Sequence, residues 1–302
     1  MQSLTAQMLH GFIPAIVTPF DARGEILGRE FSAMVDWLIR CGATAIAVAG
    51  DNGESWSLDI AERVHLTRLA VDRAAGRVPI VTGVSAPSAA QTVRYAQSVV
   101  DAGAHGLLVL PQTYVLKATR RELLKRFEAL AAAVDAPICL YNSPRRTGIE
   151  LSPDDIGALL DVAPIIAIKE SHRDFFHLSH VLHRFRDRIS VLVGPCHYIF
   201  PGIALGANGF IATGPELLGP VAGRLIEIGR QKPGPELADL HHRLTVIYQT
   251  LMSVGTWPSA FKAALNLIGQ PAGVPRDPVM ALEGADLDRL RKVLAEFGLL
   301  SR

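Results

Sequence analysis

The sequence predicts an α/β fold, namely a (β/α)8 TIM barrel with a C-terminal three-helix extension. Eight short apolar runs recur between residues 13 and 212, and stretches with helical spacing separate them. Strands that alternate with helices form right-handed βαβ units and a parallel sheet. Eight such units complete a closed barrel, and a chain of 302 residues has a usual length for one.

The eight apolar runs are the candidate strands. They cover residues 13–17, 45–49, 79–81, 106–110, 138–141, 165–169, 189–193 and 209–212. The sixth run is rich in β-branched residues, as expected of a strand that is buried on both faces. No G-x-G-x-x-G follows the first run, so the sequence does not support the dinucleotide site of an open doubly wound sheet.

The segments between the runs carry helical signals. Apolar residues recur within them at i, i+4 and i+7. Residues 88–91 and 119–122 read as capping boxes, and residues 152–155 combine an N-cap serine with a first-turn proline. After the last strand we expect a helix over about residues 221–231.

The remaining C-terminal part has no strand signal. We expect a barrel catalytic domain over residues 1–232 and a helical extension packed on it over residues 233–302. Residues 235–254, 257–268 and 286–297 read as three helices separated by turns that are rich in proline and glycine.

Composition excludes several classes of protein. The chain has 30 Lys and Arg against 29 Asp and Glu, with the signs interspersed, so nucleic-acid binding is disfavoured. The three cysteines are far apart and form no C-x-x-C pair, as is typical of a reducing compartment. Residues 1–10 do not resemble a secretory signal, and no apolar run has the length of a membrane span. We expect a soluble, cytoplasmic protein without membrane contact.

A lysine stands at the C-terminal end of the sixth run, where barrels of this type place catalytic groups. Burying an ammonium group is costly unless the charge is paired, so Glu170 or another carboxylate should neutralise or hold Lys169. A neutral amine is a nucleophile towards carbonyl carbon, which a Schiff-base enzyme requires. The alternative is an ion-paired structural lysine.

Other polar residues follow the ends of the predicted strands. Tyr141, after the fifth run, could move protons to the carbinolamine that forms on the lysine. Arg145 or Arg146 could clamp a carboxylate with two hydrogen bonds. Together with Lys169 these residues describe a site for a 2-keto acid, whose ketone reacts with the lysine.

Four segments resemble the class I pyruvate aldolases of the dihydrodipicolinate synthase and N-acetylneuraminate lyase group. They are Thr18-Pro19-Phe20, Gly50-Asp51-Asn52-Gly53-Glu54, residues 141–148 and Ile168-Lys169-Glu170. Their order and spacing make the resemblance specific, and it extends over nearly the whole chain. It implies no cofactor, small-molecule 2-keto acid and aldehyde substrates, and a homotetramer built as a dimer of dimers.

The resemblance implies a role for each matching residue. Lys169 would form the Schiff base, and Tyr141 would relay protons. Arg146 would grip the carboxylate of the second substrate. The loop after the second strand would hold the pyruvate carboxylate through Gly50, Asn52 and Gly53.

Further predicted contacts and two departures complete the candidate site. Thr18, Gly194 and Ile211 lie at strand ends and are expected to contact substrate. Asp51 and Asn52 replace the hydroxyl pair of the family motif Gly-Thr-Thr-Gly-Glu. Asp51 would carry protons, contact a different substrate or stabilise the protonated lysine or iminium; as part of a turn, it needs no function. Tyr114 stands near the family's paired tyrosines and is a candidate relay partner.

The resemblance leaves the specific reaction open. The family default is a 4-hydroxy-tetrahydrodipicolinate synthase, and the alternatives are a 2-keto-3-deoxy sugar acid aldolase or dehydratase and an N-acetylneuraminate lyase-like enzyme. Two other classes are a metal-dependent aldolase on the same fold and a non-catalytic keto-acid sensor. Three histidines spaced by three residues, at 177, 180 and 183, lack an H-E-x-x-H motif, so we expect a solvated helix face and no metal site.

Overall fold

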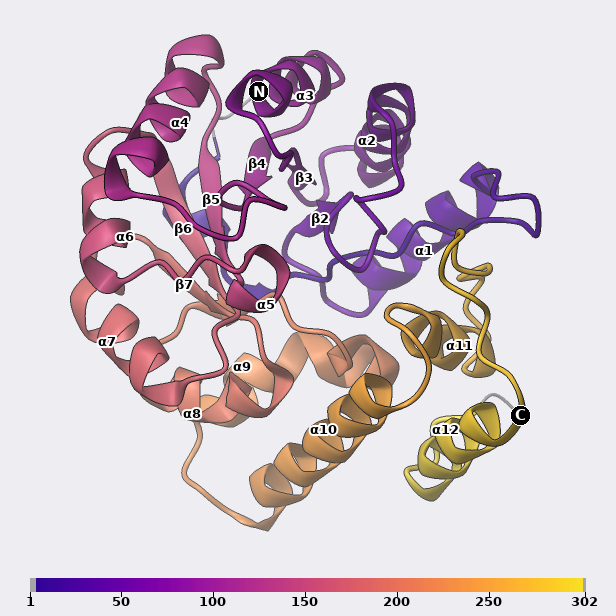
Figure 1. Ribbon diagram of the computed structural model, residues 1–302. Coiled ribbons are helices and arrows are strands. Elements are labelled where there is room, and N and C mark those ends of the chain that lie inside the picture. Colours follow the sequence, from indigo (N-terminus) through magenta and orange to yellow (C-terminus); the bar gives the residue numbers. More distant parts are fainter. Residues whose placement is uncertain (1–3, 301–302) are drawn as a thin grey trace.

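The computed structural model describes residues 4–300. Its eight strands form one parallel sheet in the order β1-β8-β7-β6-β5-β4-β3-β2 (Figure 1). The strands are β1 (Gly11–Phe12), β2 (Ile46–Val48), β3 (Ile80–Gly83), β4 (Gly106–Val109), β5 (Ile138–Asn142), β6 (Ile165–Glu170), β7 (Ser190–Val193) and β8 (Gly209–Phe210).

Hydrogen bonds beyond the regular strands close the sheet into a barrel. The Ile16 amide donates to the Ala47 carbonyl at 3.0 Å, and the Ala47 amide donates to the Pro14 carbonyl at 2.9 Å. The predicted (β/α)8 barrel is therefore confirmed. The first strand was predicted over residues 13–17, but β1 covers Gly11–Phe12. Its regular pairing with β8 ends at Phe12, because Pro14 has no amide hydrogen to continue the ladder.

Helices surround the sheet (Figure 1). They are α1 (Gly28–Arg40), α2 (Ile60–Ala74), α3 (Ala89–Asp101), α4 (Arg120–Ala133), α5 (Pro144–Thr147), α6 (Pro153–Leu160), α7 (Phe175–Phe185), α8 (Ile199–Ala204) and α9 (Leu225–Arg230). Three 3-10 segments, η1 (Ala6–Met8), η2 (Cys196–Tyr198) and η3 (Pro215–Arg224), complete this part.

Two of the predicted helix starts have the reciprocal hydrogen bonds of a capping box, which the sequence predicted at Thr119 but not at Ser152. Thr119 and Ser152 each form a capping box with the acidic residue three positions later. Ser88 caps α3 by accepting from the Gln91 amide, but the Gln91 side chain donates to the Tyr95 hydroxyl instead of returning to the cap. That predicted capping box is only half formed.

The buried apolar residues form two clusters on opposite sides of the sheet. The smaller cluster fills the barrel interior and includes Ala47, Leu108, Tyr141, Ala167 and Leu192. The larger cluster lies between the sheet and the helices. Because successive strand residues point to opposite faces, this division also decides which residues at the strand ends enter the barrel.

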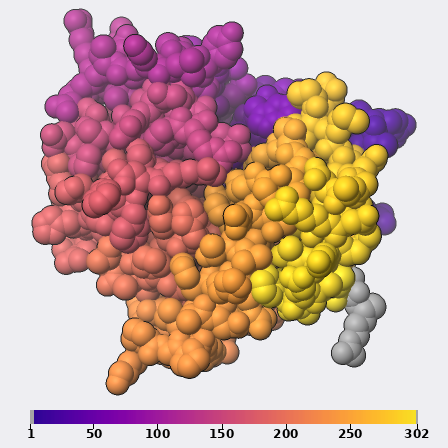
Figure 2. All heavy atoms as spheres, turned by 60° about the horizontal axis from the view of Figure 1, so that its bottom comes forward, coloured from indigo at the N-terminus to yellow at the C-terminus, as the bar shows by residue number. Residues whose placement is uncertain are grey.

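The C-terminal extension consists of α10 (Pro235–Ser253), α11 (Ser259–Leu267) and α12 (Gly284–Glu296), which confirms the three predicted helices. Figure 2 shows the orange and yellow spheres of this region lying along one side of the barrel. Within residues 4–300, no helix is both long and apolar enough to cross a membrane.

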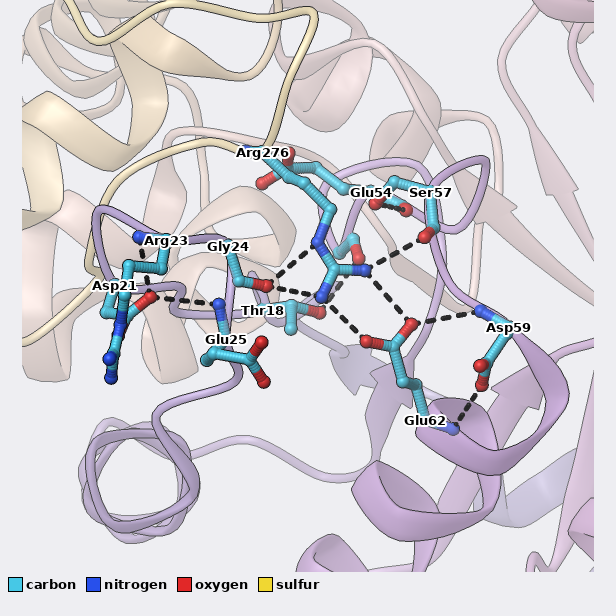
Figure 3. A network of polar contacts seen from close by, with 11 residues as sticks. Thr18, Asp21, Arg23, Gly24, Glu25, Glu54, Ser57, Asp59, Glu62 and Arg276 are labelled. Atoms are coloured by element: carbon cyan, nitrogen blue, oxygen red, sulfur yellow. Dashed lines mark hydrogen bonds and ion pairs between the residues drawn. The ribbon is translucent and has the colours of Figure 1, made fainter.

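A buried ion pair joins the extension to the loop after β2. Lys262 of α11 lies 2.5 Å from Oε1 of Glu54, and both side chains are almost completely buried. Oε2 of Glu54 accepts from the Arg276 amide at 2.9 Å. The Arg276 guanidinium in turn donates to Glu62 at 2.6 Å and to the carbonyls of Gly24 and Ser57 (Figure 3). Glu54 therefore braces its loop.

We predict that Lys262→Met lowers the free energy of unfolding by about 3–5 kcal/mol, because it leaves the Glu54 carboxylate buried without a charge partner. Urea unfolding followed by circular dichroism at fixed protomer concentration measures the change. The matched control is Glu54→Gln/Lys262→Met, which removes both charges and should recover most of the loss. A single variant within about 1 kcal/mol of the parent protein contradicts the prediction.

Candidate active site

Strand register places Tyr141 beside Lys169. The two residues are paired neighbours on β5 and β6, and both point into the barrel. Nζ of Lys169 lies 4.1 Å from the centre of the Tyr141 ring, and each residue is only 5% exposed. An amine held against a phenol ring in a largely desolvated site is positioned for carbonyl chemistry.

A pocket opens over this pair at the C-terminal ends of the strands. Of the predicted site residues, its lining contains Asp51, Asn52, Tyr141, Arg146, Lys169, Gly194 and Ile211. Gly194 donates its amide to the Glu170 carbonyl at 2.7 Å, and a Cβ there would lie 1.9 Å from Oγ of Ser171. Only glycine permits this close approach, which shapes the pocket floor between β6 and β7.

Four predicted residues do not line the pocket. The Thr18 hydroxyl donates to the Gly53 carbonyl at 2.8 Å, so it holds the loop after β2. Gly50 and Gly53 are part of that loop but do not face the pocket. Tyr114 is 88% exposed and lies outside the pocket of its own chain, so it is not placed as a relay partner there.

Glu170 does not pair with Lys169, contrary to one sequence expectation. It is the next residue on β6, so it points to the opposite face of the sheet. There its carboxylate accepts from Nδ2 of Asn142 at 3.0 Å and from the His172 amide at 2.8 Å, and Nδ1 of His177 lies 3.6 Å away. Within residues 4–300, Lys169 forms no ion pair.

Asp51 pairs with Arg146 across the pocket. Its Oδ2 accepts from Nε of Arg146 at 2.9 Å and lies 2.8 Å from the Nη2 atom. Both guanidinium nitrogens therefore contact one carboxylate oxygen in a charge-assisted pair. Asp51 thus binds Arg146, the residue that the resemblance assigns to the carboxylate of the second substrate.

Asn52 has a structural task as well as a place in the pocket lining. Its amide nitrogen donates to the Ala15 carbonyl at 3.0 Å and to the Thr213 hydroxyl at 2.9 Å. It therefore connects the ends of the first and last strands. The same loop is conformationally strained, because Ala49 and Glu54 have φ values of 50° and 55° although neither is glycine.

The lining also contains residues that the sequence did not predict as part of the site. Ser143 and Arg145 belong to the segment over residues 141–148, and Ser171 directly follows Ile168-Lys169-Glu170. Tyr248, Met252 and Trp257 come from the C-terminal extension. No local sequence signal identifies these three, because their position depends on how α10 and α11 dock.

Comparison with known proteins agrees with this arrangement. A family model described as the dihydrodipicolinate synthetase family matches residues 8–297. The chain belongs to this family. A 4-hydroxy-tetrahydrodipicolinate synthase from Methanoculleus marisnigri is 33% identical over 96% of this chain and 100% of its own length. One from a Synechococcus species is 31% identical over 96% of this chain and 94% of its own length.

Solved structures of the dihydrodipicolinate synthetase family superpose closely. The dihydrodipicolinate synthase of Aquifex aeolicus has a TM-score of 0.90 at 30% identity and covers 97% of this chain and 100% of its own. YagE, a prophage protein of E. coli K12 solved in complex with pyruvate, has a TM-score of 0.90 at 28% identity and covers 96% of this chain and 99% of its own. Within residues 4–300, no group of three His, Cys, Asp or Glu side chains is arranged to hold a metal ion.

We predict that Glu170 makes stability depend on pH. Burial raises the pKa of its carboxyl from 4.5 to about 7, against the opposing effects of His177, Asn142 and the His172 amide. Because the pKa of Glu170 is higher in the folded state than in the unfolded state, the protonated carboxyl contributes to the free energy of unfolding. This contribution is complete below pH 4.5 and is lost as pH rises through about 7. Glu170→Gln cannot titrate, so its free energy of unfolding should increase relative to that of the parent protein as pH rises from 4.5 to about 7.

Unfolding free energies of both proteins at about pH 5 and pH 8 measure this difference. Asp154→Asn, at an exposed residue of α6, serves as a control that should show no comparable change. A difference between Glu170→Gln and the parent protein that stays constant with pH contradicts the assignment.

Proposed function

We propose that this chain is a Schiff-base-forming lyase or synthase that acts on pyruvate or a related 2-keto acid and an aldehyde. The observation that carries the proposal is the Lys169 amine, held 4.1 Å from the centre of the Tyr141 ring inside a pocket at the strand ends. The family default is a 4-hydroxy-tetrahydrodipicolinate synthase, the name of relatives at 33% and 31% identity. The pyruvate complex of YagE supports the keto-acid half of the proposal.

The proposed reaction begins when Nζ of Lys169 adds to the ketone carbon. Tyr141 transfers protons as the carbinolamine loses water and becomes an iminium ion. The iminium accepts the electron pair left when a proton departs from the neighbouring carbon, which gives an enamine. The enamine carbon then attacks the aldehyde, and water releases the product from Lys169. The reverse sequence is the cleavage reaction of a lyase.

One observation favours a second acceptor class within this chemistry. Asp51 occupies Arg146, the residue that the resemblance assigns to the carboxylate of the synthase's second substrate. A 2-keto-3-deoxy sugar acid aldolase or dehydratase, or an N-acetylneuraminate lyase-like enzyme, is therefore the alternative. The metal-dependent aldolase requires no reactive lysine, so a test for the lysine adduct separates it from the proposal. The keto-acid sensor is separated instead by ligand binding without turnover across a panel of aldehydes.

We also propose a homotetramer, built as a dimer of dimers, with a barrel domain over residues 1–232 and an extension over residues 233–302. Three consecutive apolar residues, Tyr114, Val115 and Leu116, are more than half exposed on the loop after β4. An exposed apolar run of this kind is typical of an association surface. Light scattering should give four times the 32.5 kDa mass of one chain.

We predict that incubation with pyruvate and borohydride leaves one reduced pyruvate adduct, a 1-carboxyethyl group on an amine, and that peptide mapping places it on Lys169. Lys169→Met should show no adduct, and Lys262→Met should retain it at Lys169, which controls for the second buried lysine. A folded protein that forms no adduct contradicts the proposal that pyruvate is a substrate. Larger 2-keto acids are the next substrates to test.

We predict that Tyr141→Phe lowers kcat by about 100-fold, because it removes the hydroxyl proposed to transfer protons but keeps the ring beside Lys169. Steady-state turnover with the best aldehyde measures the loss, and borohydride trapping should still label the variant. Unchanged turnover excludes Tyr141 from proton transfer.

A further inference from the structure

Three arginines gather at the mouth of the pocket. Arg145 and Arg146 lie on α5, and Arg173 lies on the segment between β6 and α7. All three residues are solvent-exposed, so a solute can reach them. Burial lowers the pKa of the Arg145 guanidinium, and the positive charges of Arg173 and Arg146 lower it further. These groups are therefore close enough to repel one another.

Only one of the three has a carboxylate partner. Oδ2 of Asp51 contacts two nitrogens of the Arg146 guanidinium, as described above. Within residues 4–300, Arg145 and Arg173 form no ion pair, and the side-chain contact recorded for Arg145 is with the Met252 sulfur at 3.7 Å. The pocket mouth thus keeps two guanidinium groups without an ion pair, while the third is paired with a carboxylate of the same chain.

Aromatic packing fixes the position of Arg173. The Tyr198 hydroxyl donates to the Arg173 carbonyl at 2.8 Å, and the Tyr198 ring packs on Phe175 at 5.1 Å between centres. His197 contacts both Tyr198 and Tyr248 of α10. These contacts connect the segment that carries Arg173 to the extension, so the guanidinium is presented from a supported loop.

We propose that Arg145 and Arg173 form an anion subsite for the second substrate, and that this substrate is an aldehyde with a carboxylate or phosphate at its far end. The inference rests on the proposed function, because it assumes that Lys169 holds the keto acid. Arg146 instead holds Asp51, which fixes the loop after β2 to α5. The chain has therefore moved anion recognition from the arginine that the resemblance names to its two neighbours.

Calorimetric titration of the full chain with succinate and with inorganic phosphate, each with and without pyruvate, tests this subsite. Arg145→Gln and Arg173→Gln should each weaken binding of the preferred anion about tenfold, the loss of one charge-assisted contact. The matched control, Arg146→Gln, should weaken it less than about threefold. Asp51→Asn frees Arg146 and should strengthen binding several-fold. The tighter of the two anions identifies the terminal group.

Three outcomes overturn the proposal. One is no binding of either anion to the parent protein. Another is a loss in Arg146→Gln as large as in the other two variants, and the third is unchanged affinity in Asp51→Asn. Borohydride trapping of pyruvate on Lys169 in the same samples judges the proposed function separately. If pyruvate labels Lys169 but no anion binds, the proposed lyase or synthase function stands and the anion subsite is wrong. If an anion binds but Lys169 is not labelled, the proposed function is wrong and the anion subsite stands.

Discussion

The buried ion pair between Glu54 and Lys262 is the contact on which the site loop depends. Burial lowers the pKa of the Lys262 ammonium to about 8, while the adjacent Glu54 carboxylate opposes that shift. The Phe20 ring receives Lys262 and Arg276 at 4.6 Å and 4.1 Å from its centre. Because Glu54 ends a strained loop, contacts from the C-terminal extension hold the conformation that presents Asp51 to the pocket.

The alternation of side chains along β5 and β6 separates two kinds of chemistry. Inside the barrel, Tyr141 and Lys169 share a pocket that is open to substrate. On the outer face, Asn142 and Glu170 join a closed polar cluster with His177. Glu170 therefore supports the strand end from outside the barrel, while Tyr141 and Lys169 face the pocket.

Much of the architecture could be predicted from the sequence, because strands buried on both faces leave continuous apolar runs. The adjacency of Tyr141 and Lys169 followed from their places at the ends of successive strands. The orientation of Glu170 was also available, since its neighbour on the same strand points inward. The contributions of Tyr248, Met252 and Trp257 were not predictable, because helix docking between distant segments has no local signature.

The Asp51–Arg146 contact shows how two substitutions in one loop alter a site without altering its scaffold. Asn52 closes the strand ends through Ala15 and Thr213, so the loop keeps its place without the hydroxyls of the family motif. Asp51 then reaches across the pocket and pairs with the guanidinium of Arg146 on α5. Because the exchange leaves Lys169 untouched and changes the charge available to an acceptor, it separates the site's reactivity from its specificity. Under the proposed function, the position of Lys169 depends on barrel register, whereas acceptor choice depends on which arginine remains unpaired.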